Sequence, residues 1–140
     1  MTVENILLDC DPGLDDAAAI FLAAGSPRIH VLGITTVAGN QTIERVTKNA
    51  FFVAKMAGMG DVPIARGSLL RPQVQVCSEI HGETGLGVPV AEPERDPDPR
   101  PAAQFIVDVV MREPEKSVTL VATGPLTNVA LAARLEPKIV

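Results

Sequence analysis

The stretch ILLDCDPGLDDAAAI, residues 6–20, contains the features that determine the fold. An apolar run is followed by four aspartates within eight residues, and a run rich in alanine comes next. This order predicts a buried strand over residues 5–9, a tight turn at Gly13 and a helix over residues 15–24. The aspartates then lie at the carboxyl end of a strand, which is where open α/β sheets place their ligand sites.

The spacing of these aspartates indicates a charged cluster. Side chains alternate along a strand, so Asp9 and Asp11 share a face that Cys10 does not. Asp15 and Asp16 follow on the first turn of the helix. Because like charges repel and their burial is costly without a counter-charge, we expect a bound divalent cation, and oxygen-only ligands favour Ca²⁺ or Mg²⁺ over zinc. The alternative for Asp15 and Asp16, that they only charge a helix N-terminus, leaves the two earlier aspartates unexplained.

Strand-like and helix-like segments alternate along the rest of the chain. The expected strands cover residues 30–37, 62–65 and 117–122, the last of them buried, and the expected helices cover residues 42–56, 101–112 and 126–135. This alternation predicts an α/β fold with an open, mostly parallel sheet, flanking helices and right-handed crossovers. Residues 67–100 are rich in glycine and proline and are expected to form a flap, with a possible short strand at 74–76.

Composition excludes several classes of function. A length of 140 residues suits a single domain, and a net charge of −5 argues against a nucleic-acid surface. No apolar run approaches the roughly 20 residues of a membrane span, and no basic segment precedes the first apolar run as in a secretory signal. Two cysteines suggest neither a disulfide framework nor a zinc site, so a reducing cytoplasm is the expected location.

Four segments of the chain resemble the inosine-uridine-preferring nucleoside hydrolases. The first is the stretch at residues 6–20, and the others are ITTVAGNQ (34–41), IHGETGLG (80–87) and LVATGPLTN (120–128). Their order and spacing also resemble the family. The resemblance implies a Rossmann-like nucleoside hydrolase core, Ca²⁺ as cofactor and a ribonucleoside as substrate, hydrolysed at its N-glycosidic bond to ribose and free base. A homo-oligomer is the expected assembly.

The resemblance also implies roles for the residues of the acidic cluster. Asp11 would be a calcium ligand and the general base that takes a proton from the attacking water. Asp16 would be a second calcium ligand, and the backbone carbonyl of Thr123 a third. Asp9 would support these ligands from behind.

Three further residues would bind the substrate according to the same resemblance. Asp15 and Asn40 would contact the sugar, and His81 would contact the nucleoside from the flap. Two simpler alternatives stand beside these roles: Asn40 in a left-handed turn, and His81 as a solvated loop residue. The glycines at 82, 85 and 87 follow neither the dinucleotide pattern nor a phosphate loop, so flap flexibility is their expected purpose.

Members of this family are longer than the present chain, and their C-terminal half supplies another aspartate ligand, a histidine near the base and further sugar contacts. Residues 1–140 are therefore expected to be the N-terminal part of one nucleoside hydrolase domain, apparently truncated and inactive by itself. Which base is preferred stays open from the sequence.

Two rival hypotheses remain at this point. The haloacid-dehalogenase-like phosphatases also have a strand ending in DxD, where Asp9 would be the phosphoryl nucleophile and Mg²⁺ the cofactor, although residues 12–16 depart from their pattern. The other hypothesis is a non-catalytic metal- or sugar-binding half-domain that works by assembling with another chain.

Overall fold

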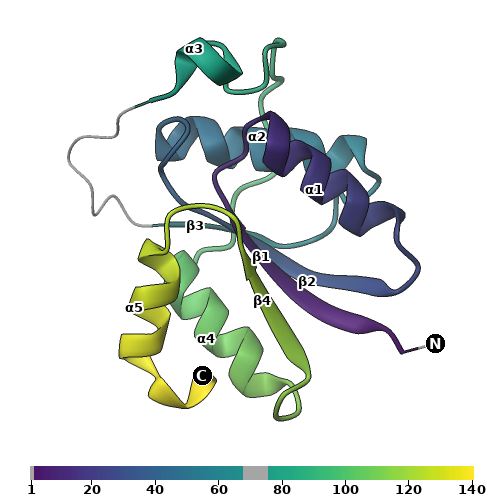
Figure 1. The fold of residues 1–140 in the computed structure, drawn as a ribbon, viewed down its shortest axis with the longest axis vertical. Helices are drawn as coiled ribbons and strands as arrows, with labels where there is room; N and C mark the ends of the chain where they lie inside the picture. Colours follow the sequence, from purple (N-terminus) through teal and green to yellow (C-terminus); the bar gives the residue numbers. More distant parts are fainter. Residues whose placement is uncertain (1, 68–75) are drawn as a thin grey trace.

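The computed structural model describes residues 2–67 and 76–140. Within these residues one parallel sheet has the strand order β3-β2-β1-β4 (Figure 1). Its strands are β1 (Glu4–Cys10), β2 (Ile29–Thr36), β3 (Ile64–Arg66) and β4 (Val118–Ala122). The predicted fold class, an open parallel sheet with flanking helices, is confirmed.

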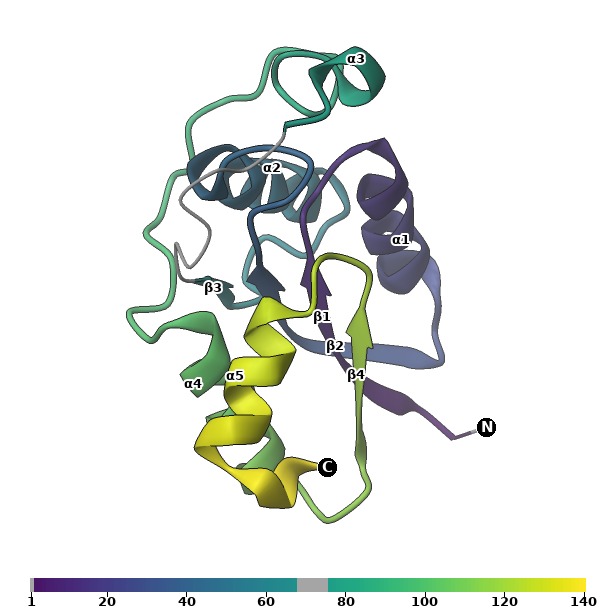
Figure 2. The same ribbon diagram turned by 60° about the vertical axis from the view of Figure 1, so that its left-hand side comes forward.

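Helices cover both faces of this sheet (Figures 1 and 2). The helices α1 (Leu14–Gly25) and α2 (Ile43–Met56) pack on one face, and α4 (Ala102–Arg112) and α5 (Thr127–Leu135) pack on the other. Two short helices complete the described part, α3 (Ser78–His81) and the 3-10 helix η1 (Pro137–Ile139). Most of these bounds lie within one or two residues of those expected from hydrophobic periodicity.

Strand β1 is the centre of the sheet, between β2 and β4. Its side chains alternate as expected, with Ile6 and Leu8 in the core beneath α1 and α2, and Leu7 in the core beneath α4 and α5. From β1 the chain proceeds to β2 and β3 on one side, and β4 lies on the other side. The carboxyl ends of β1 and β4 therefore form the switch point of the sheet, where ligands bind in folds of this kind.

Strand β4 differs from the expectation of a buried strand. It pairs with β1 and forms one edge of the sheet in the described part of the chain. Thr119 is exposed and the other residues of β4 are only half-buried. The prediction of burial was wrong. An apolar sequence shows that a strand prefers a buried position, but its actual burial depends on what pairs with its second edge.

The described part of the region expected to be a flap packs against α2. Helix α3 lies beside α2, and the chain then runs along α2 toward β3 (Figure 2). Ion pairs of Lys48 with Glu92 and of Lys55 with Glu94 attach this segment to α2. The backbone N–H of Asp98 donates to the Ile64 carbonyl at 2.8 Å, which closes the outer edge of β3.

Two finer expectations for this region have different outcomes. The possible strand at 74–76 falls mostly outside the described residues. Gly82 and Gly85 have φ angles of +74° and +86°, a left-handed conformation that side chains disfavour. A glycine suits this backbone geometry, and flexibility of the flap stays a prediction. No helix of the described part is long and apolar enough to cross a bilayer.

Candidate active site

Three carboxylates meet where β1 leads into α1. Asp9 is the penultimate residue of β1, Asp11 follows the strand, and Asp16 lies in the first turn of α1. Their exposed fractions are 0%, 6% and 3%, respectively. The turn brings α1 back over the strand end, so that the Asp16 carboxylate accepts the Asp11 backbone N–H at 2.9 Å. Two adjoining elements thus bring acidic oxygens together in a buried site.

The Asp11 carboxylate fits between the chain segments that follow β2 and β4. Its Oδ2 atom accepts the Asn40 backbone N–H at 2.6 Å, and the Asn40 side-chain amide donates to the Asp11 carbonyl at 3.1 Å. A Cβ atom on Gly39 would lie 2.2 Å from Asp11 Oδ2, and one on Gly124 would lie 2.8 Å from Oδ1. The carboxylate therefore occupies a cradle that only residues without a side chain leave open.

Replacing Gly39 with alanine is expected to disrupt this cradle. The backbone φ of Gly39 lies outside the left-handed range, so the effect is steric, and we expect a loss of about 2 kcal/mol in the free energy of unfolding. Urea denaturation measures this loss. Gly60→Ala is the matched control, because nothing lies within 4 Å of its added Cβ. Equal unfolding midpoints for the two variants would show that the cradle is not tight.

The Asp9 side chain is held by partners on two other elements. Its Oδ1 atom accepts the Thr35 hydroxyl from β2 at 2.6 Å and the Asn128 side-chain amide from α5 at 2.8 Å. Asn128 is 1% exposed and also donates to the Thr36 carbonyl at 2.9 Å. Asp9 Oδ2 and Asn128 Oδ1 are buried atoms without a hydrogen-bond partner in the described structure. Sequence reasoning gave Asn128 no role, although it ends the LVATGPLTN segment.

Burial governs the protonation of this cluster. Burial raises the pKa of Asp11 to about 6, against the hydrogen bond from Asn40 and with help from the negative charges of Asp16 and Asp15. Burial also raises the pKa values of Asp9 and Asp16. None of the ion pairs found among the described residues involves these carboxylates. Their ionised forms consequently have no ion-pair partner in this part of the chain, and the charge of His81 lowers the pKa of Asp16 less than burial raises it.

The donor set is chemically suited to a hard cation. Thr123 follows β4 and donates its N–H to the Asp9 carbonyl at 2.9 Å, and its side chain lowers the pKa of Asp16. Asp11, Asp16 and Thr123 thus offer oxygen atoms alone, which suit Ca²⁺ or Mg²⁺. Among residues 2–67 and 76–140, no group of three or more His, Cys, Asp or Glu side chains forms a metal cage. A cation here needs further oxygens beyond these.

Of the three residues expected to bind substrate, two lie against the turn after β1 and the third is exposed. His81, half-buried on α3, accepts the Leu14 backbone N–H through Nδ1 at 3.3 Å. A Cβ on Gly13 would lie 2.7 Å from His81 Nδ1 and 2.9 Å from Asn40 Nδ2, so both side chains pack against the turn after β1. Asp15 is exposed on the first turn of α1. The structure thus brings Asn40 and His81 next to the acidic cluster.

Two alternatives from the sequence are wrong. Lys116 is the one non-glycine residue with a positive φ in the described ranges, so Asn40 does not adopt a left-handed turn. A phosphatase would need the Asp9 carboxylate as an accessible nucleophile, but Asp9 is fully buried and bonded to Thr35 and Asn128. The site therefore disfavours phosphoryl transfer to Asp9.

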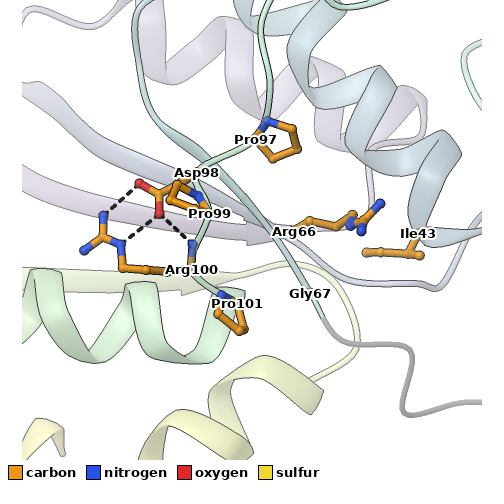
Figure 3. Close-up of a pocket in the computed structure, with 8 residues that line it drawn as sticks. All are labelled: Ile43, Arg66, Gly67, Pro97, Asp98, Pro99, Arg100 and Pro101. Carbon is orange, nitrogen blue, oxygen red and sulfur yellow. Dashed lines mark hydrogen bonds and ion pairs between the residues drawn. The ribbon is translucent and has the colours of Figure 1, made fainter.

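A separate cavity of about 550 Å³ lies at the end of β3 (Figure 3). It is lined by Ile43, Arg66, Gly67 and residues 97–101. Within this lining, the Arg100 guanidinium is paired with the Asp98 carboxylate at 2.8 Å. None of the residues discussed for the acidic cluster lines this cavity, so it is distinct from the candidate site.

Comparisons with known proteins find relatives that cover nearly the whole chain. The family model described as inosine-uridine preferring nucleoside hydrolase matches residues 6–140. An inosine-uridine preferring nucleoside hydrolase from Leishmania major is 54% identical over 140 residues, which is 97% of this chain and 45% of that protein. A pyrimidine-specific ribonucleoside hydrolase from Photobacterium profundum is 44% identical over 90% of this chain and 41% of its own length.

Solved structures extend the match to three dimensions. A plant nucleoside hydrolase superposes with a TM-score of 0.88 and 35% identity, over 97% of this chain and 44% of that chain. The present chain spans a little under half the length of the curated relatives it matches. On the match of the family model to nearly all of its residues, the chain belongs to the inosine-uridine preferring nucleoside hydrolase family.

Proposed function

We propose that this chain carries the calcium- and water-handling half of a ribonucleoside hydrolase site. The observation that carries the proposal is the convergence of Asp11 and Asp16, both buried and without a cationic partner among the described ion pairs, at the switch point of the sheet. Membership of the nucleoside hydrolase family supports the reaction class. The reaction is hydrolysis of the bond between a base and ribose.

In this proposal Asp11 has two tasks, and Asp16, Thr123 and Asp9 have one each. Asp11 and Asp16, with the Thr123 carbonyl, hold a Ca²⁺ ion. Bound there, the ion supplies Lewis acidity toward a water molecule and balances the carboxylate charges. Asp11 accepts the proton of the attacking water, and its Oδ2 is oriented by the Asn40 N–H. Asp9 is fixed by Thr35 and Asn128 and keeps the end of β1 in place.

The substrate contacts are proposed beside the same turn, where Asn40 bonds Asp11 and His81 bonds Leu14. Asp15 and Asn40 bind ribose hydroxyls, and His81 contacts the nucleoside from α3. The transition state of glycoside cleavage resembles an oxocarbenium ion, so the anionic cluster favours the positive charge that develops on the sugar. The two curated relatives differ in their named base preference, inosine-uridine and pyrimidine, and we assign none to this chain.

The context proposed for the protein follows the same reasoning. We propose that the protein is cytoplasmic and acts in purine or pyrimidine salvage. We also propose that it forms a homo-oligomer, in which subunits associate through surfaces that are exposed in the single chain. Among residues 2–67 and 76–140, β4 has no strand on its second edge, and a free strand edge is a template for pairing, which supports association. By itself the 140-residue chain is expected to bind the cation without turning over nucleosides.

Fusion to a relative tests the proposed activity. Residues 1–140 are joined to the remaining C-terminal part of the Leishmania major relative, and hydrolysis of inosine and uridine is measured. We expect activity in the fusion and none in the chain alone. Asp11→Asn in the fusion should reduce kcat by at least about a hundredfold, since it removes the general base and a metal ligand.

Two results would refute this assignment. A folded fusion that hydrolyses neither nucleoside would refute the proposed reaction class. Full activity of the Asp11→Asn fusion would show that Asp11 is not the general base. Turnover by residues 1–140 alone would contradict only the expectation that the site is incomplete. Asp61→Asn in the same fusion is the matched control, because Asp61 is an exposed aspartate outside the cluster.

A further inference from the structure

Asn49 is a buried polar residue that the proposed mechanism does not use. It lies on α2 with 1% of its surface exposed. Its Nδ2 atom donates to the Pro12 carbonyl at 2.9 Å and to the Thr84 carbonyl at 2.9 Å. The first carbonyl belongs to the turn between Asp11 and α1, and the second belongs to the loop that follows α3. One amide group thus joins the acidic turn to the loop that directly follows His81.

Neighbouring side chains attach the same loop to α2 without reaching the turn. Gln41 donates to the Ser78 hydroxyl at 3.0 Å, and the Arg45 guanidinium donates to the Glu83 carbonyl at 2.7 Å. Gln41 also accepts from Arg45 at 3.1 Å. The start of α2 is therefore a docking surface for residues 78–84, and among these three side chains Asn49 alone contacts the acidic turn as well.

The loop is built to fit closely over Asn49. A Cβ on Gly85 would lie 2.8 Å from Asn49 Nδ2 and 3.5 Å from the Pro12 carbonyl oxygen. The backbone of Gly85 also has a φ of +86°. The Gly87 N–H closes the loop onto the His81 carbonyl at 3.0 Å. Asn49 is therefore connected to His81 through this loop.

We propose that Asn49 is a positioning residue of the nucleoside site. Its two hydrogen bonds fix the spacing between Pro12 and Thr84, and this spacing holds the His81 imidazole on the Leu14 N–H, beside Asn40. The inference rests on the proposed function in one respect, the assignment of His81 to the nucleoside. Asn49 itself touches no reacting atom, and its effect on the site passes through His81.

The Leu14 amide is a direct reporter of this arrangement. Leu14 is the first residue of α1, so its N–H has no acceptor within the helix and donates to His81. The Ala17 N–H donates to the Gly13 carbonyl at 3.0 Å and reports on the same helical turn independently of His81. Hydrogen exchange of both amides is measured by NMR on the 140-residue chain. The ¹⁵N shift of His81 Nδ1 at pH 8 is a second readout, with His30 as the internal reference.

Asn49→Leu keeps the size of the side chain and removes both donors. We expect exchange of the Leu14 amide to become roughly tenfold faster, with the Ala17 amide and the His30 shift unchanged. His81→Ala should give the same change at Leu14, and the double variant should add nothing further. Thr47→Val is the matched control, because Thr47 is a buried polar residue of α2 that bonds Ile43 and Thr36 but not the loop.

The outcomes separate positioning from a merely structural role. Equal acceleration at Leu14 and Ala17 would mean that Asn49 only supports the fold, and unchanged exchange at Leu14 would overturn the inference outright. If Asn49→Leu does not fold, Asn49→Ser, which cannot span both carbonyls, is measured against the same criteria. None of these readouts requires turnover. Failure of the proposed hydrolase activity and failure of the positioning role of Asn49 can therefore be told apart.

Discussion

Asp11→Asn is expected to abolish stabilisation by Ca²⁺ and, at the same time, to make the calcium-free chain more stable at pH 7.5. The variant removes a metal ligand, so the added ion no longer favours the folded state. It also removes a charge that is buried beside Asp16 without a cation. Loss of this charge should raise the free energy of unfolding by an amount on the order of 2 kcal/mol.

Thermal unfolding with and without calcium measures both effects. In the wild type, a calcium concentration about 100 times Kd should add about 2.7 kcal/mol to the stability, and in Asp11→Asn the addition should vanish. Asp61→Asn is the matched control, because it removes the same charge from an exposed position. If Asp11→Asn kept the calcium effect, Asp11 would not be a metal ligand. If the variant destabilised the calcium-free chain, other groups would have to stabilise the ionised form of Asp11.

The stability of the calcium-free chain is expected to fall as the pH rises from about 4 to about 6. Burial raises the pKa of Asp11 from 3.8 to about 6, so the folded state binds this proton more tightly than the unfolded state does. The contribution is fully present below the unfolded pKa and is lost as the pH rises through the folded pKa. At about 1.4 kcal/mol per pH unit, the loss from Asp11 is about 3 kcal/mol.

Urea denaturation in chelator across this pH range tests the sign of the effect. Asp9 and Asp16 should act in the same direction, since burial raises their pKa values too. Saturating calcium should flatten the profile, because the ion competes with protons for the carboxylates. Below about pH 4 the profile should turn down, since Arg100 lowers the pKa of Asp98, whose ionised form favours the fold. A calcium-free stability that rises steadily between pH 4 and pH 6 would contradict the burial of uncompensated carboxylates.

The features that could be predicted from the sequence are those set by local periodicity. The stretch at residues 6–20 determines a strand, a turn and a helix through neighbouring residues, so the order of residues alone predicts that Asp9, Asp11 and Asp16 lie together. The alternation of strands and helices likewise predicts the parallel sheet, because parallel strands need long crossovers.

The features that could not be predicted depend on partners far along the chain. Asn128 reaches Asp9 across 119 positions, and Asn49 reaches Pro12 and Thr84 across 37 and 35. The helical period does place Asn49 on the apolar face of α2, three residues after Val46, but nothing local indicates which carbonyls it binds. The half-exposure of β4 was missed for the same reason, because it depends on the second edge of the strand and not on its sequence.

Calorimetric titration of the 140-residue chain with CaCl₂ at pH 7.5 tests the central claim most directly. Two buried carboxylates from adjoining elements, Asp11 and Asp16, are expected to bind one ion per chain. The heat of binding should disappear in the variant carrying both Asp11→Asn and Asp16→Asn. Absence of saturable binding to the wild type, or binding that survives in the double variant, would contradict the account.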